Sequence, residues 1–211
     1  VIVGRGWGQG PTHSQNLQAW FAHIPGLRVI VPALPRDAYG LLRAAIADPS
    51  PTVVIEHRWL HSTSGSLESD EWSHDLASSR MIRRGEDLTI CASGLMTLEA
   101  IRAADWLSGL GVACDVIDLR TLNPFDWATI IESVWTTGRL VVADGASMTG
   151  SISAEVVARV ATGLHGRLAA PPLRLAHPDL PEPTSAALTR GFHVTAADIA
   201  RGALSLLGRE D

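Results

Sequence analysis

The sequence predicts an α/β protein made of three-layer domains, each with a parallel β-sheet between two layers of helices. Short, continuous apolar runs alternate with longer amphipathic runs along the 211 residues of the chain. The apolar runs are rich in β-branched residues and are bounded by glycine or proline, as is typical of strands that are buried on both faces. An order of strand, helix and strand indicates parallel strands joined by crossover helices.

The first 60 residues contain three of these strands and two helices. We expect the strands over 1–5, 28–32 and 52–57, and the helices over 14–23 and 36–48. Such a set would leave one edge of a hydrophobic parallel sheet uncovered, which stable domains avoid. This half is therefore predicted to be incomplete, and we expect sequence before Val1 or a dedicated partner chain to supply the rest.

Residues 61–86 interrupt the alternation, because they are polar and show little periodicity. A connection of this length is unusual inside a compact domain, so we interpret it as a linker. Residues 87–211 are predicted to form a second, complete α/β domain. We expect its strands over 87–93, 113–119, 139–145 and 172–178, and its helices over 97–110, 125–136, 152–165 and 195–207. Trp127 and Trp135 share one face of the second of these helices, and we expect both indoles to be buried in this domain or at a dimer contact.

The composition excludes several classes of partner and chemistry. The net charge is −5 and the arginines do not gather on one predicted face, so we expect neither nucleic acid nor an anionic membrane surface as a partner. All basic residues are arginine, which excludes Schiff-base chemistry through lysine. Cys91 and Cys114 lie inside apolar runs, as expected for buried, reduced thiols. No apolar stretch is long enough to cross a membrane, and we expect a cytoplasmic protein.

The segment GQGPTHSQNLQAW, residues 8–20, is the first candidate for chemistry. A glycine-rich turn that leads from the carboxyl end of a strand into a helix is where α/β sheets bind ligands, and Ser14 is placed to cap that helix. His13 would lie at the mouth of such a site, where an imidazole donates or accepts a proton near neutral pH. The alternative is a turn histidine that bonds to local backbone. The spacing matches neither a P-loop nor a dinucleotide fingerprint.

Several long segments follow one recognisable pattern. They are HSQNLQAWFAHIPGLRVIVPALPRDAYGLLRAAIADPSPTVVIEHRWLH in the first half, and GEDLTICASG, VACDVIDLRTLNPFDWATIIESVWTTGRLVVAD and SAEVVARV in the second. Together they resemble the β subunits of thiamine-diphosphate-dependent 2-oxo acid dehydrogenases. The resemblance implies the C-terminal half of a transketolase-type pyrimidine-binding domain over 1–60, the linker over 61–86 and a transketolase C-terminal-type domain over 87–211. The sequence GPTH is also similar to transketolase and deoxyxylulose-phosphate synthase, which share this architecture.

The resemblance also implies roles for particular residues. His13 matches the family histidine that faces the thiazolium ring and the substrate-derived group, where it helps proton or acyl transfer. A structural potassium ion is implied at the backbone carbonyls of Ala45, Ile46, Asp48 and Ser50. Carbonyl oxygens suit a hard cation, but the same segment is equally suited to be a simple helix C-cap.

Other polar residues have a local interpretation or depart from the family pattern. His23 precedes a Pro-Gly pair at a helix end, and we expect it to cap or pack locally. Glu56 is followed by HRWLH, which puts His61 where the family commonly has the tyrosine of a Leu-Tyr pair. His57 and His61 either line the mouth of the site or lie in the solvated linker. Asp144 matches the family's acidic or histidine-bearing turn only loosely, so we expect contacts with a lipoyl carrier or a partner subunit to differ.

The resemblance implies thiamine diphosphate and Mg²⁺ as cofactors, bound mainly by a partner. The family glutamate that activates the cofactor belongs to a part of the pattern upstream of this sequence, and the Gly-Asp-Gly…Asn motif that holds the diphosphate and Mg²⁺ does not occur here. The expected partners are an α-subunit-like chain with that motif and a chain or segment that completes the pyrimidine domain. Two-fold self-association through the C-terminal domain is also expected.

The expected function is that of a β-subunit-like component of a heteromeric enzyme, which decarboxylates a 2-oxo acid and transfers the acyl unit to an acceptor. Two alternatives stay open. A transketolase-like enzyme would move a ketol unit between sugars, and a non-catalytic assembly subunit would perform no chemistry of its own.

Overall fold

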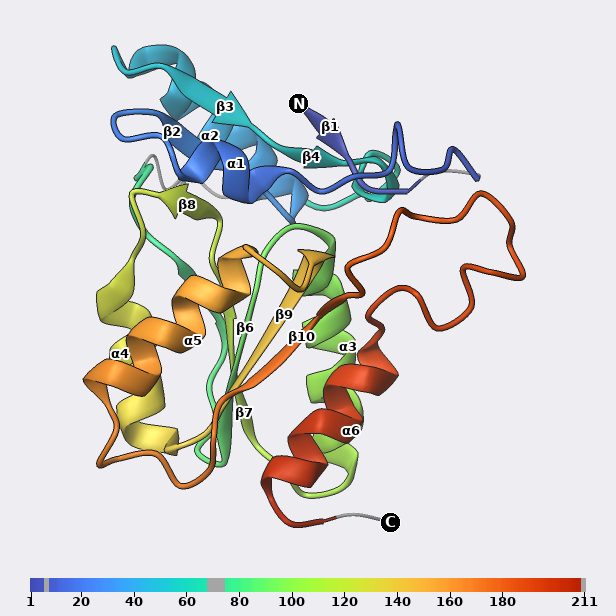
Figure 1. Ribbon diagram of the computed structural model, residues 1–211. Coiled ribbons are helices and arrows are strands. Elements are labelled where there is room, and N and C mark those ends of the chain that lie inside the picture. Colours follow the sequence, from blue (N-terminus) through green and yellow to red (C-terminus); the bar gives the residue numbers. More distant parts are fainter. Residues whose placement is uncertain (6–7, 68–74, 210–211) are drawn as a thin grey trace.

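The computed structural model describes residues 1–5, 8–67 and 75–209, and its second half is built on a five-stranded sheet (Figure 1). Four strands are parallel to one another, in the order β10-β9-β6-β7. They are β6 (Leu88–Ala92), β7 (Cys114–Asp118), β9 (Leu140–Ser147) and β10 (Leu173–His177). Next to β7, the strand β5 (Arg80–Arg83) adds an antiparallel edge. The predicted α/β class is confirmed.

Helices cover both faces of this sheet, so the second half has three layers (Figure 1). The helices α3 (Leu95–Gly109) and α6 (Ala196–Leu206) lie on one face, and α4 (Trp127–Thr137) and α5 (Ile152–Gly163) lie on the other. The alternation along β6 explains this division. Leu88 and Ile90 pack with α3 and α6, whereas the next residue, Cys91, packs with α4 and α5.

The first half lies at the carboxyl ends of these parallel strands (Figure 1). Its elements are β1 (Ile2–Val3), α1 (Gln18–Ala22), β2 (Arg28–Ile30), α2 (Pro35–Ala47), β3 (Thr52–Val54), β4 (Glu56–His57) and the 3₁₀ helix η1 (Arg58–Leu60). β1 pairs in parallel with β4, and β2 pairs in parallel with β3. The strand β8 (Thr121–Asn123), which comes from the second half of the sequence, pairs antiparallel with β2. The two halves are therefore joined by backbone hydrogen bonds.

Part of the segment that we interpreted as a linker belongs to the five-stranded sheet. Residues 80–83 form β5, in which Met81 and Ile82 pack against the cores on opposite faces. Pairing with β7 and contact with both cores stabilise a strand that is too short to show in the sequence pattern. Residues 68–74 of the same segment lie outside the described residues, and the boundaries of the linker stay a prediction.

The two indoles of α4 are less buried than expected. Trp135 is 52% exposed, and the guanidinium of Arg167 lies 4.3 Å from the centroid of its ring. Trp127 is half-buried, because it stacks on Phe125 at a centroid distance of 4.4 Å and Arg159 lies 4.5 Å from its ring centroid. Burial of both indoles within the domain was therefore a wrong expectation, and contact with a second copy stays a prediction.

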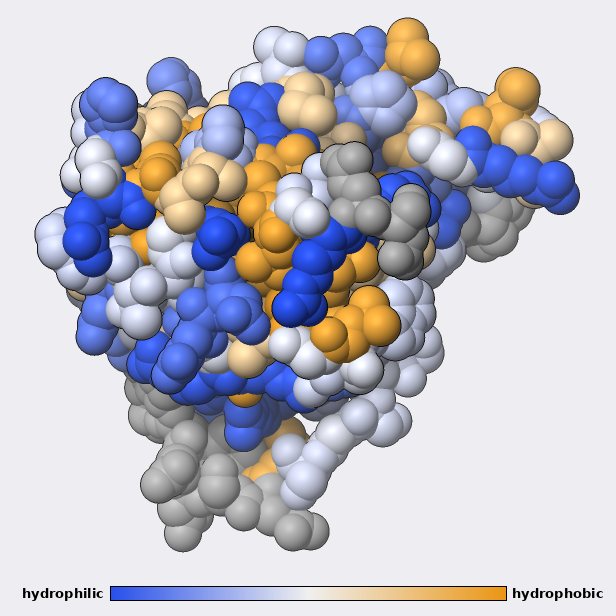
Figure 2. All heavy atoms as spheres, turned by 90° about the horizontal axis from the view of Figure 1, so that it is seen from below, coloured by the Kyte–Doolittle hydropathy of each residue, from blue (hydrophilic) through white to orange (hydrophobic). Residues whose placement is uncertain are grey.

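The two cysteines are buried, as expected from the sequence. Cys91 and Cys114 are buried and unpaired, and burial raises the pKa of the Cys114 thiol to about 12. The face seen from below shows hydrophobic residues near its middle, interrupted and bordered by hydrophilic ones (Figure 2). None of the helices in the described ranges is long and apolar enough to span a bilayer.

Candidate functional site

The loop between β1 and α1 carries the predicted catalytic histidine at the surface. Arg58, the first residue of η1, donates hydrogen bonds from Nε to the carbonyl of Gly4 (3.2 Å) and from Nη2 to the carbonyl of His13 (3.0 Å). Gln15 Nε2 donates to the carbonyl of Pro11 (2.7 Å). These bonds hold the loop backbone in place, while the side of the loop that bears His13 is exposed to solvent.

Glycines allow this loop to lie against two other segments of the chain. Gly4 has a φ of +75° and Gly10 a φ of +66°, which L side chains rarely adopt. A Cβ on Gly4 would collide with the buried imidazole of His57, and one on Gly10 would lie 2.6 Å from Oγ1 of Thr184. The glycines thus permit close packing of the loop against its own chain.

The start of α1 differs from the expected capped helix. The helix begins at Gln18 instead of residue 14, and its N-cap residue, Leu17, makes no side-chain capping bond. Ser14 is buried, and its hydroxyl has no hydrogen-bond partner within the described ranges. The expected capping role of Ser14 was therefore wrong, and the loop extends four residues further than predicted from its sequence, since it ends at Leu17.

Asp144 ties the start of α1 to the second half. Its carboxylate accepts hydrogen bonds from Gln18 Nε2 (3.1 Å), the N–H of Ala146 (3.0 Å) and the N–H of Ser153 (3.0 Å). Ser153 lies in the first turn of α5, where a helix favours negative charge. Burial raises the pKa of Asp144, and these donors oppose that shift. We assign Asp144 a structural role in positioning α1.

A cavity of about 80 Å³ lies beside the loop, between the two halves of the chain. Its lining includes Arg5, just after β1, together with the side chains of His57, His177 and His193. Burial lowers the pKa of His57 and of His177 to about 4 and that of His193 to about 3, with Arg5 adding to each shift. The three imidazoles are therefore neutral at pH 7.

Sequence reasoning found only one residue of this cluster, His57. His177 ends β10 and His193 lies just before α6, so these two rings meet within the second half, and the packing of the two halves brings Arg5 and His57 to them. The available signals were weak: a histidine at the end of the strand-like segment LRLAH, and another just before a helix.

The other histidines that the sequence singled out lie at helix ends. His23 is exposed at the end of α1, and its N–H donates to the carbonyl of Ala19 (3.0 Å). His61 is exposed at the end of η1, and its N–H donates to the carbonyl of Arg58 (3.2 Å). Of the pair His57 and His61, the buried His57 is the one that lines the cavity.

The segment predicted to hold potassium forms the C-terminal end of α2. The Asp48 carboxylate accepts hydrogen bonds from the N–H of Ser50 (2.8 Å) and from Arg28 Nε (3.1 Å), and these bonds lower its pKa. The potassium site at the carbonyls of Ala45, Ile46, Asp48 and Ser50 stays a prediction. Across the described ranges, no group of three or more His, Cys, Asp or Glu side chains is placed to hold a metal ion.

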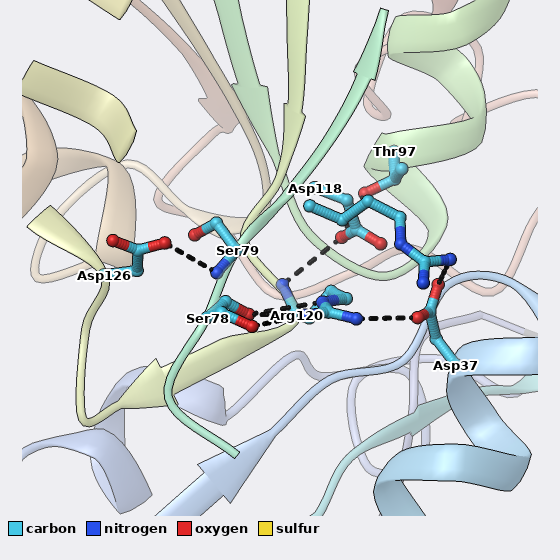
Figure 3. A network of polar contacts seen from close by, with 8 residues as sticks. Asp37, Ser78, Ser79, Thr97, Asp118, Arg120 and Asp126 are labelled. Atoms are coloured by element: carbon cyan, nitrogen blue, oxygen red, sulfur yellow. Dashed lines mark hydrogen bonds and ion pairs between the residues drawn. The ribbon is translucent and has the colours of Figure 1, made fainter. Parts of the chain in front are cut away.

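A buried ion network joins α2 to the second half (Figure 3). Asp37 of α2 accepts from Arg120 Nη1 (2.9 Å) and from Arg80 Nη1 (3.1 Å). Arg120 also donates to the carbonyl and the hydroxyl of Ser78. The nearby Asp118 is fully buried, and burial raises its pKa to about 7. This network is remote from the reactive loop in sequence, and we assign it to the packing of the two halves.

Two family models match the chain in succession. The family described as "Transketolase, pyrimidine binding domain" matches residues 4–62, and that described as "Transketolase, C-terminal domain" matches residues 77–199. Among solved structures, a split-gene transketolase described as an inactive β4 tetramer aligns with a TM-score of 0.78 and 24% identity, over 99% of this chain and 66% of that chain. This likeness concerns the fold.

Curated relatives extend the similarity to individual subunits. The β subunit of acetoin:2,6-dichlorophenolindophenol oxidoreductase from Cupriavidus necator is 38% identical over 96% of this chain and 60% of its own length. The pyruvate dehydrogenase E1 component subunit beta of Bacillus subtilis is 40% identical over 83% of this chain and 54% of its own length. The 2-oxoisovalerate dehydrogenase subunit beta of Bacillus subtilis is 36% identical over 80% of this chain and 52% of its own length. The chain thus spans roughly half the length of these relatives.

Proposed function

Because the chain belongs to the transketolase C-terminal-domain family, we propose that it is a β-subunit-like component of a heteromeric, thiamine-diphosphate-dependent enzyme. This enzyme decarboxylates a 2-oxo acid and transfers the acyl unit to an acceptor. The proposal is supported by the names of its relatives, which are β subunits of an acetoin oxidoreductase, a pyruvate dehydrogenase and a 2-oxoisovalerate dehydrogenase.

The observation that carries the proposal is the position of His13. It lies on the exposed side of a loop whose backbone is bonded to Arg58 and packed against Thr184. A side chain presented to solvent from a fixed backbone is suited to act on a group that a partner holds. In the proposed role, a ring nitrogen of His13 donates a proton to the reacting centre or accepts one from it.

The described residues do not fit the diphosphate and Mg²⁺ of the cofactor. They include no cluster of acidic, histidine or cysteine side chains placed to hold a metal, and the sequence lacks the Gly-Asp-Gly…Asn motif. Thiamine diphosphate supplies carbanion stabilisation when it is bound. We place the diphosphate and Mg²⁺ on an α-subunit-like partner, and we assign the loop with His13 to this chain. A potassium ion at the end of α2 is part of the same proposal.

Two surfaces are assigned to partners. Within the described residues, β1 pairs with β4 alone, so its other edge offers unpaired backbone groups. We place there the chain or segment that completes the pyrimidine domain. The face of α4 that carries Trp127 and Trp135 is assigned to two-fold self-association, since contact would remove both indoles from water. We assign the assembled enzyme to the cytoplasm.

Ketol transfer and a purely structural role have less support. The solved transketolase is 24% identical to this chain, so it supports the fold and says nothing of the reaction. A purely structural role assigns no function to the exposed His13, whereas the proposed function does.

The test is reconstitution of the full β polypeptide with its α-subunit-like partner. With thiamine diphosphate, Mg²⁺ and an artificial electron acceptor, the complex should release CO₂ from pyruvate or 2-oxoisovalerate, and neither chain alone should do so. Turnover of acetoin alone, or transfer of a ketol unit between sugar phosphates without release of CO₂, would contradict the proposal.

A further inference from the structure

The cavity between the two halves is not used by the reaction proposed above. Its polar lining includes Arg5, Gln18 and His57 from the first half, and His177, His193 and the carboxylate-bearing Glu99 from the second half. The rest of its lining includes apolar residues from both halves, among them Val31, Ile55, Leu95 and Met96. The site therefore exists only when the halves are packed together.

Arg5 is a cation without a close anionic partner. Its guanidinium lies 4.2 Å from the centroid of the Trp59 ring, and none of the ion pairs within the described residues involves it. Burial lowers the pKa of Arg5, and the carboxylates of Glu182 and of Glu99, which lines the same cavity, oppose this shift. Glu99 is already engaged by Arg102 (2.6 Å) and by a backbone N–H. The guanidinium is thus partly desolvated and still able to bind an anion.

The histidines add unused hydrogen-bonding atoms beside this cation. His177 is 7% exposed, and its Nε2 is buried without a hydrogen-bond partner in the described part of the chain. His193 Nε2 lies 3.3 Å from Glu182 Oε1, but the geometry does not make a hydrogen bond. His57 Nδ1 accepts from the N–H of Trp59 (3.2 Å), which leaves the proton of the neutral ring on Nε2. Buried polar atoms without partners are unfavourable, and a ligand that bonds to them is stabilised.

We propose that this cavity binds a short-chain carboxylate, with its carboxylate group on Arg5 and the histidines and its aliphatic part against the apolar lining. The planar guanidinium matches a carboxylate, because it offers parallel N–H donors. A cavity of about 80 Å³ admits only a few non-hydrogen atoms, as in acetate or propionate. Glu182 and Glu99 disfavour a second negative charge, so phosphate is a poor ligand.

The test measures binding of propionate to the full protein by calorimetry, and therefore does not depend on turnover. We expect saturable binding, with inorganic phosphate and the uncharged propionamide failing to compete. In R5Q the affinity should fall at least tenfold, because the cation is lost. R167Q is the matched control, since Arg167 also stacks on a tryptophan, Trp135, but lies outside the cavity, and its affinity should equal that of the wild type.

A second variant keeps the test independent of folding defects. E182Q removes a carboxylate near Arg5, so it should bind propionate more tightly than the wild type, which a misfolded protein would not do. The proposal is overturned by an absence of saturable propionate binding, by equal affinities in R5Q and R167Q, or by weaker binding in E182Q. Competition by phosphate would overturn the carboxylate assignment.

Discussion

At the scale of single residues, Gly4 shows how one position sets the path of the reactive loop. Gly4 and Gly26 both have positive φ values, +75° and +83°, but only Gly4 packs against another group, the buried ring of His57. G26A should cost about 1 kcal/mol, the penalty of the left-handed backbone. G4A should cost about 2–4 kcal/mol, because overpacking against the ring adds to that penalty. Urea unfolding measures both, and equal costs would show that the His57 contact is unimportant.

The buried histidines should make stability depend on pH. Their pKa values in the folded chain, about 4 for His57 and His177 and about 3 for His193, lie below the value of about 6.5 in an unfolded chain. The unfolded state therefore binds more protons below pH 6.5, and the free energy of unfolding should fall as the pH drops from 6.5 to 4. Asp118, with its pKa raised to about 7, opposes this trend together with Asp144 and Glu182, whose pKa values burial also raises. The carboxylates whose pKa values are lowered, Asp48, Asp126 and Asp179, act in the same direction as the histidines.

The variant H177F isolates one of these contributions. It removes a group that binds a proton in the unfolded chain but is neutral in the folded chain. The slope of the unfolding free energy against pH is proportional to the difference in bound protons between the two states, and between pH 4.5 and 6 this difference should decrease by nearly one. Urea unfolding at several pH values measures the slope. An unchanged slope would mean that His177 titrates normally in the folded protein.

At the scale of elements, the sequence predicted those whose hydrophobic pattern is long. The strands β6, β7, β9 and β10 and the helices between them lie close to their predicted ranges. The short strands β5 and β8 escaped prediction, because three or four residues show no periodicity and their stability comes from pairing with β7 and β2. The pattern also placed the start of α1 too early, since polar residues 14–17 are compatible with either a helix or a loop.

The ion network between α2 and the second half should be a major contributor to stability. The Arg120 and Asp37 side chains are only 3% and 2% exposed, so R120A leaves a buried carboxylate with Arg80 as its remaining cation. We expect R120A to lower the free energy of unfolding by about 3 kcal/mol or more. R120K keeps the positive charge but loses the guanidinium N–H groups that donate to Ser78. Its free energy of unfolding should therefore lie between those of the wild type and R120A.

The matched control for this prediction is R83A. Arg83 pairs with Asp105 at 3.1 Å, but both side chains are exposed, at 38% and 60%, and such pairs contribute about 0–1 kcal/mol. Urea unfolding of the three variants ranks the contributions. A loss in R120A no larger than that in R83A would show that the halves do not depend on this network.

At the scale of the whole molecule, the candidate site divides into a part that the sequence could predict and a part that it could not. His13 was found because it lies in a local motif, a glycine-rich turn between a strand and a helix. The cluster of Arg5, His177 and His193 was missed, because its members are far apart in sequence and meet only when the halves pack. The role of Asp144 in holding α1 was missed for the same reason.

The central claim is that this chain contributes His13 to a site completed by a partner. The most direct measurement compares turnover, thiamine-diphosphate affinity and melting temperature of H13A and H23A in the assembled complex. Both imidazoles are exposed, so both variants should fold as the wild type does and bind the cofactor with similar affinity. Turnover of H13A should fall roughly 10²–10⁴-fold, the usual contribution of a general acid–base residue, and that of H23A should stay near the wild-type value. Wild-type turnover in H13A would contradict the claim and favour a subunit without chemistry of its own.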